Sequence, residues 1–492
     1  MVLRTRLVGL TGLLIFGLIL LGGCATSSSP ASNTARPWSS ALPNGPVSHV
    51  GRWLVDQSGR VLLFHGVNMV DKTAPFYPSS EGFSTDDAQW LAQSGFRVVR
   101  LGILATGLMP SPGVVSQSYI NQIAKTVNLL GSHGIYTLVD FHQDGYGPSI
   151  GSDGFPSWMV ETNGKVNNGV GFPLYYIANP AVRQAFQSFW DDQRSSDGRG
   201  LEQDYGIMFK AVARKFANNP YVLGYDLFNE PWPGNVWKSC LYNSNGCPGL
   251  THQELDKAYS IATKAIRSTG DHHLIFGEPF VLFNFGMAGT TLSLPGNDKN
   301  SGMSFHMYTL TPSREPDVIS NAISWSKKTG GALLNTEWAT SNFAPDAIRQ
   351  SSELDQALLP WIYWSFDGGL VKDVLQPPTG ANLVGGDVTA VVQPYPLAVA
   401  GTPLSFSYVN SDRTLTFSWS TTGVGSKGLS PHAVTSFEVP SEVYPNGYLL
   451  SITGGKILSK PCVSIVELKA YSGARKVTVT ISPGPSSSCA HG

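Results

Sequence analysis

Short apolar segments alternate with helical stretches over most of the chain, from about residue 52 to residue 367. Eight segments read as buried strands: Leu62–Asn68, Val98–Leu101, Tyr136–His142, Val222–Asn229, Leu274–Glu278, Met303–Tyr308, Ala332–Glu337 and Ile362–Phe366. The stretches with helical spacing are Thr85–Gln93, Tyr119–His133, Glu202–Phe216, Gln253–Ser268 and Pro316–Lys328. Strands that alternate with helices form parallel sheets covered by helices. Eight such units predict a (β/α)8 TIM barrel, and a doubly wound open sheet is the alternative.

Two of these strands end in a glutamate. The run from Tyr221 to Phe228 is followed by Asn229-Glu230-Pro231, and proline cannot continue a central strand, so Glu230 lies where the strand stops. The second glutamate is Glu337. Active sites of such barrels lie at the carboxyl ends of the strands. Two carboxylates there suit the retaining hydrolysis of a glycosidic bond, which needs a proton donor and a nucleophile about 5–5.5 Å apart.

Further polar or aromatic residues lie at or near the ends of the other strands: Arg100, His142, His306, Tyr308 and Trp364. With Asn229, Glu230 and Glu337 they form the ordered set Arg, His, Asn-Glu, His-x-Tyr, Glu, Trp. This set resembles the signature of glycoside hydrolase family 5, over roughly residues 62–367. The short segments GVNMVDK, DFHQD and FNEPWPG look most like the endoglycoceramidase branch of that family.

The resemblance implies roles for the residues of the set. Glu230 would be the general acid/base, whose pKa burial and the second carboxylate would raise. Asn229 would hydrogen-bond the sugar 2-hydroxyl. Glu337 would be the nucleophile, and Arg100 would hold it ionised, since an adjacent cation favours the charged form. Tyr308 would donate a hydrogen bond to the same carboxylate.

Other residues are expected to bind the substrate. His142 and His306 would bind sugar hydroxyls or support the carboxylates, and Trp364 would offer a flat apolar face to the sugar ring. Lys72 and Asp144 follow two strand ends and match positions that contact the sugar in the endoglycoceramidase branch. The aromatic-rich stretch from residue 155 to residue 176 would give apolar surface near the mouth of the barrel, which suits a lipid-bearing leaving group.

The expected reaction is hydrolysis of the β-linkage between a sugar or oligosaccharide and a ceramide-like lipid. Alternatives are an endo-β-glucanase or mannanase acting on soluble polysaccharide, a β-glucosidase for sterol or other lipid glycosides, and a carbohydrate-binding surface lipoprotein without activity. No metal or cofactor is implied, because two carboxylates and water suffice. The segment from Gly147 to Gly151 matches the GxSxG elbow of serine hydrolases, but no helical pattern follows it, as that elbow requires.

The first residues predict export. Arg4 and Arg6 precede the apolar run from Leu7 to Leu21, which indicates a signal peptide over residues 1–23. The segment LGGC resembles a bacterial lipobox, in which Cys24 becomes the lipidated first residue; an ordinary signal peptide with an incidental cysteine is the alternative. Residues 24–48 then read as a lipid anchor and flexible tether. We expect a lipoprotein anchored at a membrane or the bacterial cell surface, or a secreted protein.

Four cysteines remain besides Cys24, and an even number in an exported chain indicates disulfides. Of the three possible pairings, proximity favours Cys240–Cys247 and Cys462–Cys489. A zinc site is the alternative, although the spacings within the two pairs are not those of a CxxC site.

After about Pro378 the pattern changes to period-two alternation, in LSFSYV, TLTFSWS, SFEVP, YLLSIT, SIVELKAY and KVTVTIS. This alternation predicts an antiparallel β-sandwich. We therefore expect a catalytic barrel over residues 49–380 and a sandwich over residues 381–492. The net charge of −1, without a basic stripe in the sequence, gives no sign of a nucleic-acid partner. The sequence does not indicate an oligomeric state.

Overall fold

The computed structural model describes residues 42–43, 45–339, 344–425 and 428–485. The expected signal peptide, the lipobox cysteine Cys24, most of the tether, and Cys489 lie outside these residues. Within them, no helix combines the length and the apolar character that crossing a bilayer requires.

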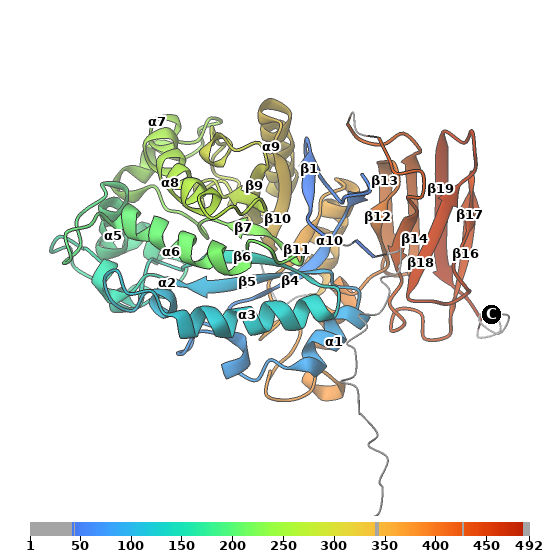
Figure 1. Cartoon of the computed structure of the whole chain (residues 1–492), viewed down its shortest axis with the longest axis horizontal. Coiled ribbons are helices and arrows are strands. Elements are labelled where there is room, and N and C mark those ends of the chain that lie inside the picture. The colour runs from blue at the N-terminus through green and yellow to red at the C-terminus, as the bar shows by residue number, and fades with distance from the viewer. Residues whose placement is uncertain (1–41, 44, 340–343, 426–427, 486–492) are drawn as a thin grey trace, which may run out of the picture. The chain divides into compact units, whose positions relative to one another are not determined.

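Eight parallel strands close into a barrel in the order β10-β11-β4-β5-β6-β7-β8-β9, which confirms the predicted fold class (Figure 1). They are β4 (His65–Met69), β5 (Val98–Leu104), β6 (Tyr136–His142), β7 (Val222–Asp226), β8 (Leu274–Gly277), β9 (Ser301–Met307), β10 (Ala332–Trp338) and β11 (Trp361–Tyr363). Every residue of these strands is buried. Burial on both faces explains why they read as continuous apolar runs rather than as alternating ones.

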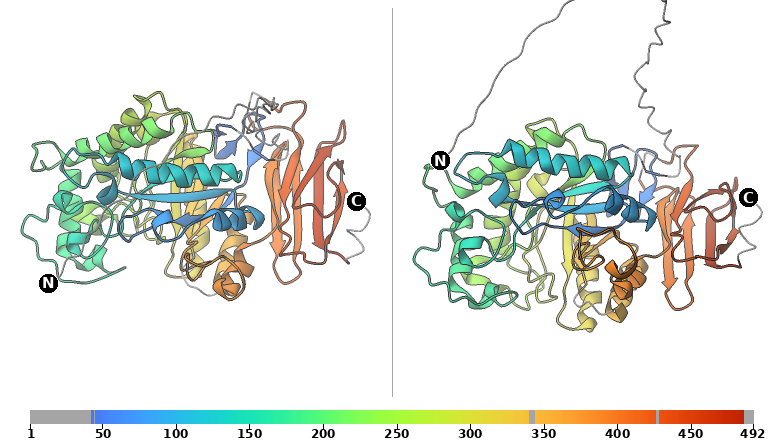
Figure 2. Two further views of the ribbon diagram at one scale, coloured as in Figure 1. Left: turned by 60° about the horizontal axis from the view of Figure 1, so that its bottom comes forward. Right: turned by 90° about the horizontal axis from the view of Figure 1, so that it is seen from below.

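Helices enclose the barrel strands, as Figures 1 and 2 show. The longer ones are α1 (Thr85–Gln93), α3 (Gln117–Ser132), α5 (Pro180–Trp190), α6 (Leu201–Phe216), α8 (Asp256–Arg267), α9 (Glu315–Thr329) and α10 (Ala344–Gln356); the shorter ones are α2 (Ala105–Leu108), α4 (Tyr175–Ala178), α7 (Pro248–Leu250) and α11 (Gly385–Val391). Local signals set their ends. The Ser116 hydroxyl accepts a hydrogen bond from the Tyr119 amide (3.2 Å) at the start of α3. Gly330, with a φ of 79°, ends α9.

The C-terminal part contains two antiparallel sheets. One has the order β13-β14-β19-β16, from β13 (Thr402–Val409), β14 (Thr414–Ser420), β16 (Tyr448–Thr453) and β19 (Lys476–Pro483). The other has the order β1-β2-β3-β12-β15-β18-β17, from β1 (Ser48–Val50), β2 (Trp53–Val55), β3 (Val61–Leu62), β12 (Tyr395–Val399), β15 (Thr435–Glu438), β17 (Gly455–Ile457) and β18 (Ile465–Ala470). Buried and less buried residues alternate along β19, as period-two patterning predicts.

One expected strand divides between the two parts. The segment Leu62–Asn68 was predicted to be the first barrel strand, but β3 pairs with β12 of the C-terminal sheet, whereas β4 pairs with β5 and β11 of the barrel. The first strands of the chain therefore belong to the C-terminal sheet. The reason is that a buried strand is apolar in either sheet, so periodicity does not show where the chain passes from one to the other.

The C-terminal sheets contact the barrel at the amino-terminal ends of its strands. His65, the first residue of β4, is stacked between Trp361 (3.9 Å between ring centroids) and Tyr395 (3.8 Å). Beside β5, the Arg97 Nε donates to Glu438 Oε1 at 2.6 Å. The carboxyl ends of the barrel strands are thereby left for the loops that form the site.

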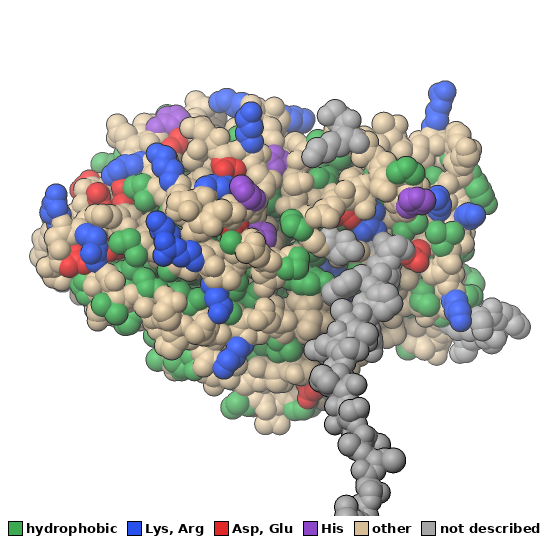
Figure 3. All heavy atoms as spheres, viewed as in Figure 1, with side chains coloured by type: hydrophobic (Ala, Val, Ile, Leu, Met, Phe, Trp, Pro, Cys, Tyr) green, Lys and Arg blue, Asp and Glu red, His purple; other side chains and the backbone are tan. Residues whose placement is uncertain are grey.

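On the face of the molecule in Figure 3, Lys and Arg side chains are scattered among other residues rather than joined in a stripe. This distribution agrees with the near-neutral charge balance of the sequence.

Candidate active site

The guanidinium group of Arg100 lies at the centre of the site, in the middle of β5, and is fully buried. It donates hydrogen bonds to six acceptor residues: Glu337 (2.6 Å), Asp226 (2.8 Å), Asp140 (2.9 Å), Asn229 (2.9 Å), Asn68 (3.2 Å) and Glu278 (3.2 Å). Burial opposes its positive charge, but the surrounding carboxylates outweigh that effect and hold the pKa of Arg100 well above its usual value. Arg100 thus fixes the ends of several strands relative to one another.

The two strand-end glutamates lie close together, on either side of the same histidine nitrogen. The Nδ1 of His306 is 3.0 Å from Glu230 Oε1 and 3.6 Å from Glu337 Oε2. The two facing carboxylate oxygens cannot be further apart than these distances together. This upper bound includes the ~5–5.5 Å carboxyl separation of retaining glycosidases and lies at the lower limit of the ~6.5–9.5 Å of inverting ones.

The backbone of Glu230 adopts a left-handed conformation, with a φ of 46°. A non-glycine residue is held in this region only when its surroundings impose it, and such residues cluster at functional sites. Here the amide of Gln143 donates to the carbonyl oxygens of Asn229 (2.6 Å) and Glu230 (3.2 Å). The backbone N–H of Glu230 donates to Glu278 Oε2 at 3.2 Å. The strained turn therefore aims the Glu230 side chain into the site.

Burial raises the pKa of Glu230, and the negative charge of Glu337 raises it further, although His306 opposes both effects. Glu230 is 5% exposed, so its carboxyl group is largely shielded from water while one side remains accessible. A carboxyl group with a raised pKa can hold a proton near neutral pH, as a general acid must.

Both oxygens of Glu337 are engaged by donors. Arg100 donates to Oε1 at 2.6 Å, and the hydroxyl of Tyr308 donates to Oε2 at 2.9 Å. These two hydrogen bonds fix the orientation of the Glu337 carboxyl group.

A third strand-end glutamate, Glu278, lies beside the pair and was not singled out from the sequence. It follows β8 and is fully buried, and its Oε1 is 2.9 Å from His306 Nε2. This contact is a close ion pair rather than a well-aligned hydrogen bond. Burial raises the pKa of Glu278 to about 7, despite the opposing charge of His306. The sequence signal was present, because Glu278 ends a predicted strand just as Glu337 does.

Asp140 and Asp226 were also missed. Both are fully buried, on β6 and β7, and both accept hydrogen bonds from Arg100. Asp140 Oδ2 also lies 2.7 Å from His142 Nδ1. An aspartate inside an apolar strand is a signal that could have found them, since a buried charge needs a partner.

The pair of glutamates lies at the base of a cavity of about 690 Å³. One part of its wall is polar and comes from residues that the sequence singled out, Lys72, His142, Asp144 and Trp364, together with Asp153. The imidazole of His142 stacks on Trp364 (5.6 Å between centroids, 13° between planes), and Lys72 Nζ lies 5.1 Å from the Trp364 ring.

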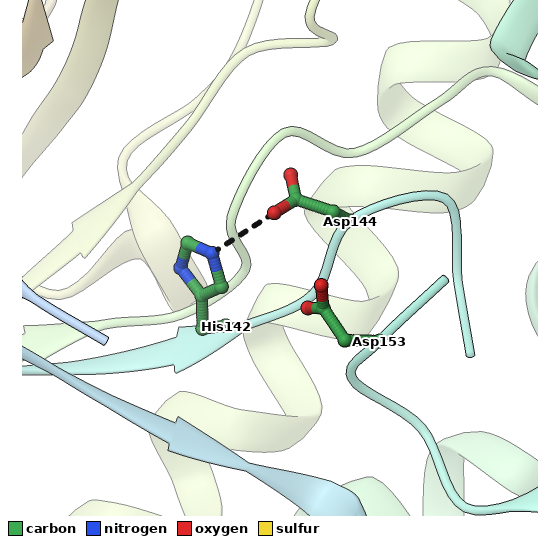
Figure 4. Close-up of side chains that lie close together, drawn as sticks. All are labelled: His142, Asp144 and Asp153. Carbon is green, nitrogen blue, oxygen red and sulfur yellow. Dashed lines mark hydrogen bonds and ion pairs between the residues drawn. The ribbon is translucent and has the colours of Figure 1, made fainter. Parts of the chain in front are cut away.

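His142, Asp144 and Asp153 form a compact group on this wall, shown in Figure 4. Their donor atoms lie within 4.8 Å of one another, a spacing that would suit a metal ion. However, the ammonium group of Lys72 contacts Asp144 and lies 3.7 Å from Asp153 Oδ2. The positive charge that these carboxylates require is therefore supplied by the chain itself.

Apolar residues also line the cavity, among them Phe172, Phe285 and Leu310. Phe172 lies between β6 and β7, as Asp144 and Asp153 do. In the closed ring of strands, β8 lies four places from β4 in either direction. Phe285 follows β8 and Leu310 follows β9, whereas Lys72 follows β4 and Trp364 follows β11. Phe172 is 72% exposed and Leu310 is 73% exposed, so both project from the surface beside the cavity. The cavity wall thus combines polar groups with exposed apolar side chains.

The aromatic-rich stretch from residue 155 to residue 176 divides between core and surface. Phe155, Met159 and Tyr176 are buried in the core, while Phe172 lies on the cavity wall. Only part of the stretch therefore provides apolar surface at the mouth.

The remaining sequence-selected residues are placed as follows. The side-chain oxygen of Asn229 accepts a hydrogen bond from Arg100 (2.9 Å), and its amide donates to the Gln143 carbonyl (2.9 Å). The segment Pro148–Ile150 is a short 3-10 helix rather than the turn between a strand and a helix that a serine nucleophile requires.

The disulfide Cys240–Cys247 is present, which confirms this part of the expected pairing. The second pairing, Cys462–Cys489, stays a prediction because Cys489 lies outside the described residues.

A (β/α)8 barrel with paired carboxylates at its strand ends defines a glycoside hydrolase. Residues 55–369 match the family model described as cellulase (glycosyl hydrolase family 5), and residues 393–481 match the glycoside hydrolase family 5 C-terminal domain. The chain belongs to glycosyl hydrolase family 5.

Relatives of known activity are similar over most of the chain. It is 29% identical over 480 residues to endoglycoceramidase I of Rhodococcus hoagii (strain 103S), covering 90% of both proteins. It is 28% identical over 445 residues to an endoglycoceramidase of Hydra vulgaris, covering 81% of both. Among solved structures, endo-glycoceramidase II from Rhodococcus sp. superposes with a TM-score of 0.70 at 25% identity, over 88% of this chain and 99% of that one.

Proposed function

We propose that this protein is a retaining β-glycosidase that cleaves the linkage between a sugar or oligosaccharide and a ceramide-like lipid. The observation that carries the proposal is the cavity beside the glutamate pair, whose lining combines polar and apolar groups. Lys72, Asp144 and the Trp364 ring line it together with Phe172, Phe285 and Leu310. Similarity to endoglycoceramidases supports the same substrate class.

In the proposed reaction, Glu337 attacks the anomeric carbon while Glu230 gives its proton to the glycosidic oxygen. The carbon–oxygen bond to the lipid breaks and a glycosyl–Glu337 ester forms. Glu230, now a carboxylate, then takes a proton from water as that water attacks the anomeric carbon, which frees Glu337 and retains the configuration. On the polar wall, the ammonium group of Lys72 and the carboxylate of Asp144 would orient the sugar hydroxyls.

The roles of the two glutamates can be separated by chemical rescue. Glu337→Gly should abolish turnover, and azide should partly restore activity on an activated β-glycoside and give an α-glycosyl azide. Glu230→Ala should instead give a β-glycosyl azide, because the glycosyl-enzyme still forms. A sugar product of inverted configuration from the wild-type enzyme would contradict the retaining mechanism.

The substrate class can be tested with glycosylceramides, sterol glucosides and soluble β-glucans, with products identified by mass spectrometry. Contacts with a remote lipid can lower the barrier at the sugar. We therefore expect kcat/KM on a glycosylceramide to exceed that on the same sugar carried by a short alkyl chain. Faster cleavage of carboxymethylcellulose or mannan would instead identify a polysaccharide hydrolase.

We further propose that the enzyme is exported and anchored to a membrane through a lipidated Cys24. The motifs in residues 1–24 support this proposal. The mature protein should begin at Cys24 and partition into detergent. Cys24→Ser should release it while the purified protein keeps its kcat. Intact mass of the mature protein checks both the cleavage site and the lipid, and an unmodified Cys24 would remove the anchor.

A further inference from the structure

Glu230, His306 and Glu278 form a continuous chain of ionisable side chains that begins at the proposed acid/base, Glu230. His306 lies between Glu230 and Glu278, with Nδ1 3.0 Å from Glu230 Oε1 and Nε2 2.9 Å from Glu278 Oε1. His306 and Glu278 are both fully buried. Glu278 also accepts the backbone N–H of Glu230 at 3.2 Å. The same carboxylate therefore supports both the strained backbone and, through the imidazole, the side chain of Glu230.

The groups around the chain come from several strands. His306 faces Glu230 after β7, Glu278 after β8 and Glu337 on β10. The ring of Tyr308, just after β9, lies edge-on to the imidazole at 5.8 Å between centroids. Burial opposes the charge on His306, but these carboxylates outweigh it and hold the pKa of His306 well above its usual value.

Around Glu278, Arg100 Nη2 lies 3.2 Å away and the amide of Asn284 donates at 3.4 Å. The Asn284 side-chain oxygen in turn accepts the backbone N–H of His306 at 3.0 Å. Asp226 adds a further negative charge nearby. Glu278 and His306 are therefore fixed to each other through the same neighbour.

We propose that Glu278 is a positioning residue for the acid/base: it keeps a proton on His306 Nε2 and so presents Nδ1 to Glu230 in both steps of the reaction. This inference rests on the proposed roles of Glu230 and Glu337. A histidine whose second nitrogen is held by a carboxylate is fixed in tautomer and orientation, as in other base–orienter pairs.

The hydrogen bond from His306 to Glu230 acts differently when the glycosyl-enzyme forms and when water cleaves it. When Glu230 gives its proton to the glycosidic oxygen, the new carboxylate accepts a hydrogen bond from His306 Nδ1–H and is stabilised. When water attacks the glycosyl-enzyme, Glu230 must be ionised to take up the proton of that water, and the same hydrogen bond favours that form. Without Glu278, His306 loses its proton at lower pH and Glu230 becomes a weaker base.

Glu278→Gln tests this inference in the full-length protein, because glutamine keeps the size of the side chain and removes its charge. Two substrates are compared: the best glycosylceramide of the substrate screen, and the 2,4-dinitrophenyl β-glycoside of the same sugar, whose leaving group needs no proton. On the glycosylceramide, kcat/KM should fall by about tenfold or more. On the dinitrophenyl glycoside, kcat/KM should stay within about threefold, while kcat and KM fall together because deglycosylation becomes limiting.

The pH profile gives a second readout that a merely structural defect would not move. With His306 less charged, Glu230 keeps its proton to higher pH, so the descending limb of kcat/KM on the glycosylceramide should shift to higher pH. His306→Asn is the matched variant and should give the same shift. The double variant should lose less than about threefold beyond His306→Asn alone, because residues that act through one another are not additive.

Equal losses on both substrates, an unmoved pH profile, or losses that multiply in the double variant would overturn the inference. If Glu278→Gln fails to fold, ¹⁵N spectra of histidine-labelled wild-type protein decide the matter, because they report whether His306 Nε2 carries a proton at neutral pH. An unprotonated Nε2 overturns it. Failure of the azide rescue at Glu337 or Glu230 would count against the proposed function instead.

Discussion

Arg97 and Arg100 lie three residues apart on the same stretch of chain, and both are buried, yet their surroundings differ. Arg97 pairs with one carboxylate, Glu438, at 2.6 Å, where the barrel meets the C-terminal sheets. Arg100 faces four carboxylates at the other end of the strands: Asp140, Asp226, Glu278 and Glu337.

The difference lies in the balance of charge. The Arg97 pair is matched one to one, which suits a fixed contact between two parts of the chain. Around Arg100 four carboxylates face one guanidinium group. Its positive charge does not offset the effect of burial, which raises the pKa of Asp226 to about 6 and that of Glu278 to about 7. Groups that titrate near neutral pH mark functional sites. The excess of buried carboxylates therefore lowers the stability of the folded state, and it supplies the titratable groups that a functional site needs.

The largest effect is expected at the unbalanced centre. Arg100→Met should lower kcat about a thousandfold, because Glu337 loses a buried donor and the remaining carboxylates repel one another. Thermal unfolding and kcat measured on the purified variant separate lost activity from lost folding. If the folded variant kept wild-type kcat, the centre would not differ in kind from the Arg97 pair.

Arg97→Met should act on stability alone. Breaking a buried ion pair leaves Glu438 without a partner and costs about 3 kcal/mol of unfolding free energy, measured by urea unfolding. The kcat of the folded protein should not change. Arg97→Met/Glu438→Leu should recover most of the loss, since an apolar pair avoids the buried charge; a lower kcat in either variant would link this contact to the site.

Asp226 gives the unbalanced centre a pH dependence. In the folded protein its carboxyl group binds a proton at about pH 6, whereas in the unfolded chain it does so near pH ~3.9. Between these values the folded state holds more protons, so the free energy of unfolding falls as the pH rises. Asp226→Asn should reduce this fall by about 2 kcal/mol in urea unfolding across that window. Glu438→Gln is the comparison at the balanced pair, and an equal change there would remove the distinction.

Lys72 is intermediate, because it is partly exposed and faces two carboxylates, Asp144 and Asp153. Lys72→Met should raise KM for the glycosylceramide about tenfold, about 1.4 kcal/mol, through the loss of charged hydrogen bonds to the sugar. The kcat should change less than KM. An unchanged KM would show that this lysine only neutralises its neighbours.

Lys72→Met should also allow a metal ion to bind at the polar wall. Without the ammonium group, His142, Asp144 and Asp153 keep donor atoms within 4.8 Å of one another. Mn²⁺ should then raise the Tm of Lys72→Met by a few degrees and leave the wild-type Tm unchanged. Lys72→Met/Asp153→Asn is the matched control, in which the gain should disappear.

Sequence patterns were sufficient to predict the barrel and to locate Glu230 and Glu337 at the carboxyl ends of its strands. Glu230 could be found because it follows an apolar run and precedes a proline, although β7 itself ends earlier, at Asp226. Glu337 could be found because it ends a segment predicted as a strand. Glu278 was missed although it also ends a predicted strand. The role proposed for Glu278 depends on its distance to His306, and distances across a barrel are set by closure of the sheet rather than by local sequence.

The expected strand Leu62–Asn68 shows a second limit. Pairing of β3 with β12 is a contact between segments far apart in the chain. Local periodicity reports whether a segment is buried and does not report which sheet buries it. The apolar lining of the cavity has the same origin, because Phe172, Phe285 and Leu310 come from three separate loops.

The pairing of β3 with β12 also bears on the time course of synthesis. Val61 and Leu62 find their partners Val399 and Ala398 only after the whole barrel has been made. At ribosomal speeds of ~5–20 residues per second, this interval is on the order of tens of seconds. Strands made late thus complete a sheet that the first ones began, and a chain truncated before β12 would leave β3 paired with β2 alone.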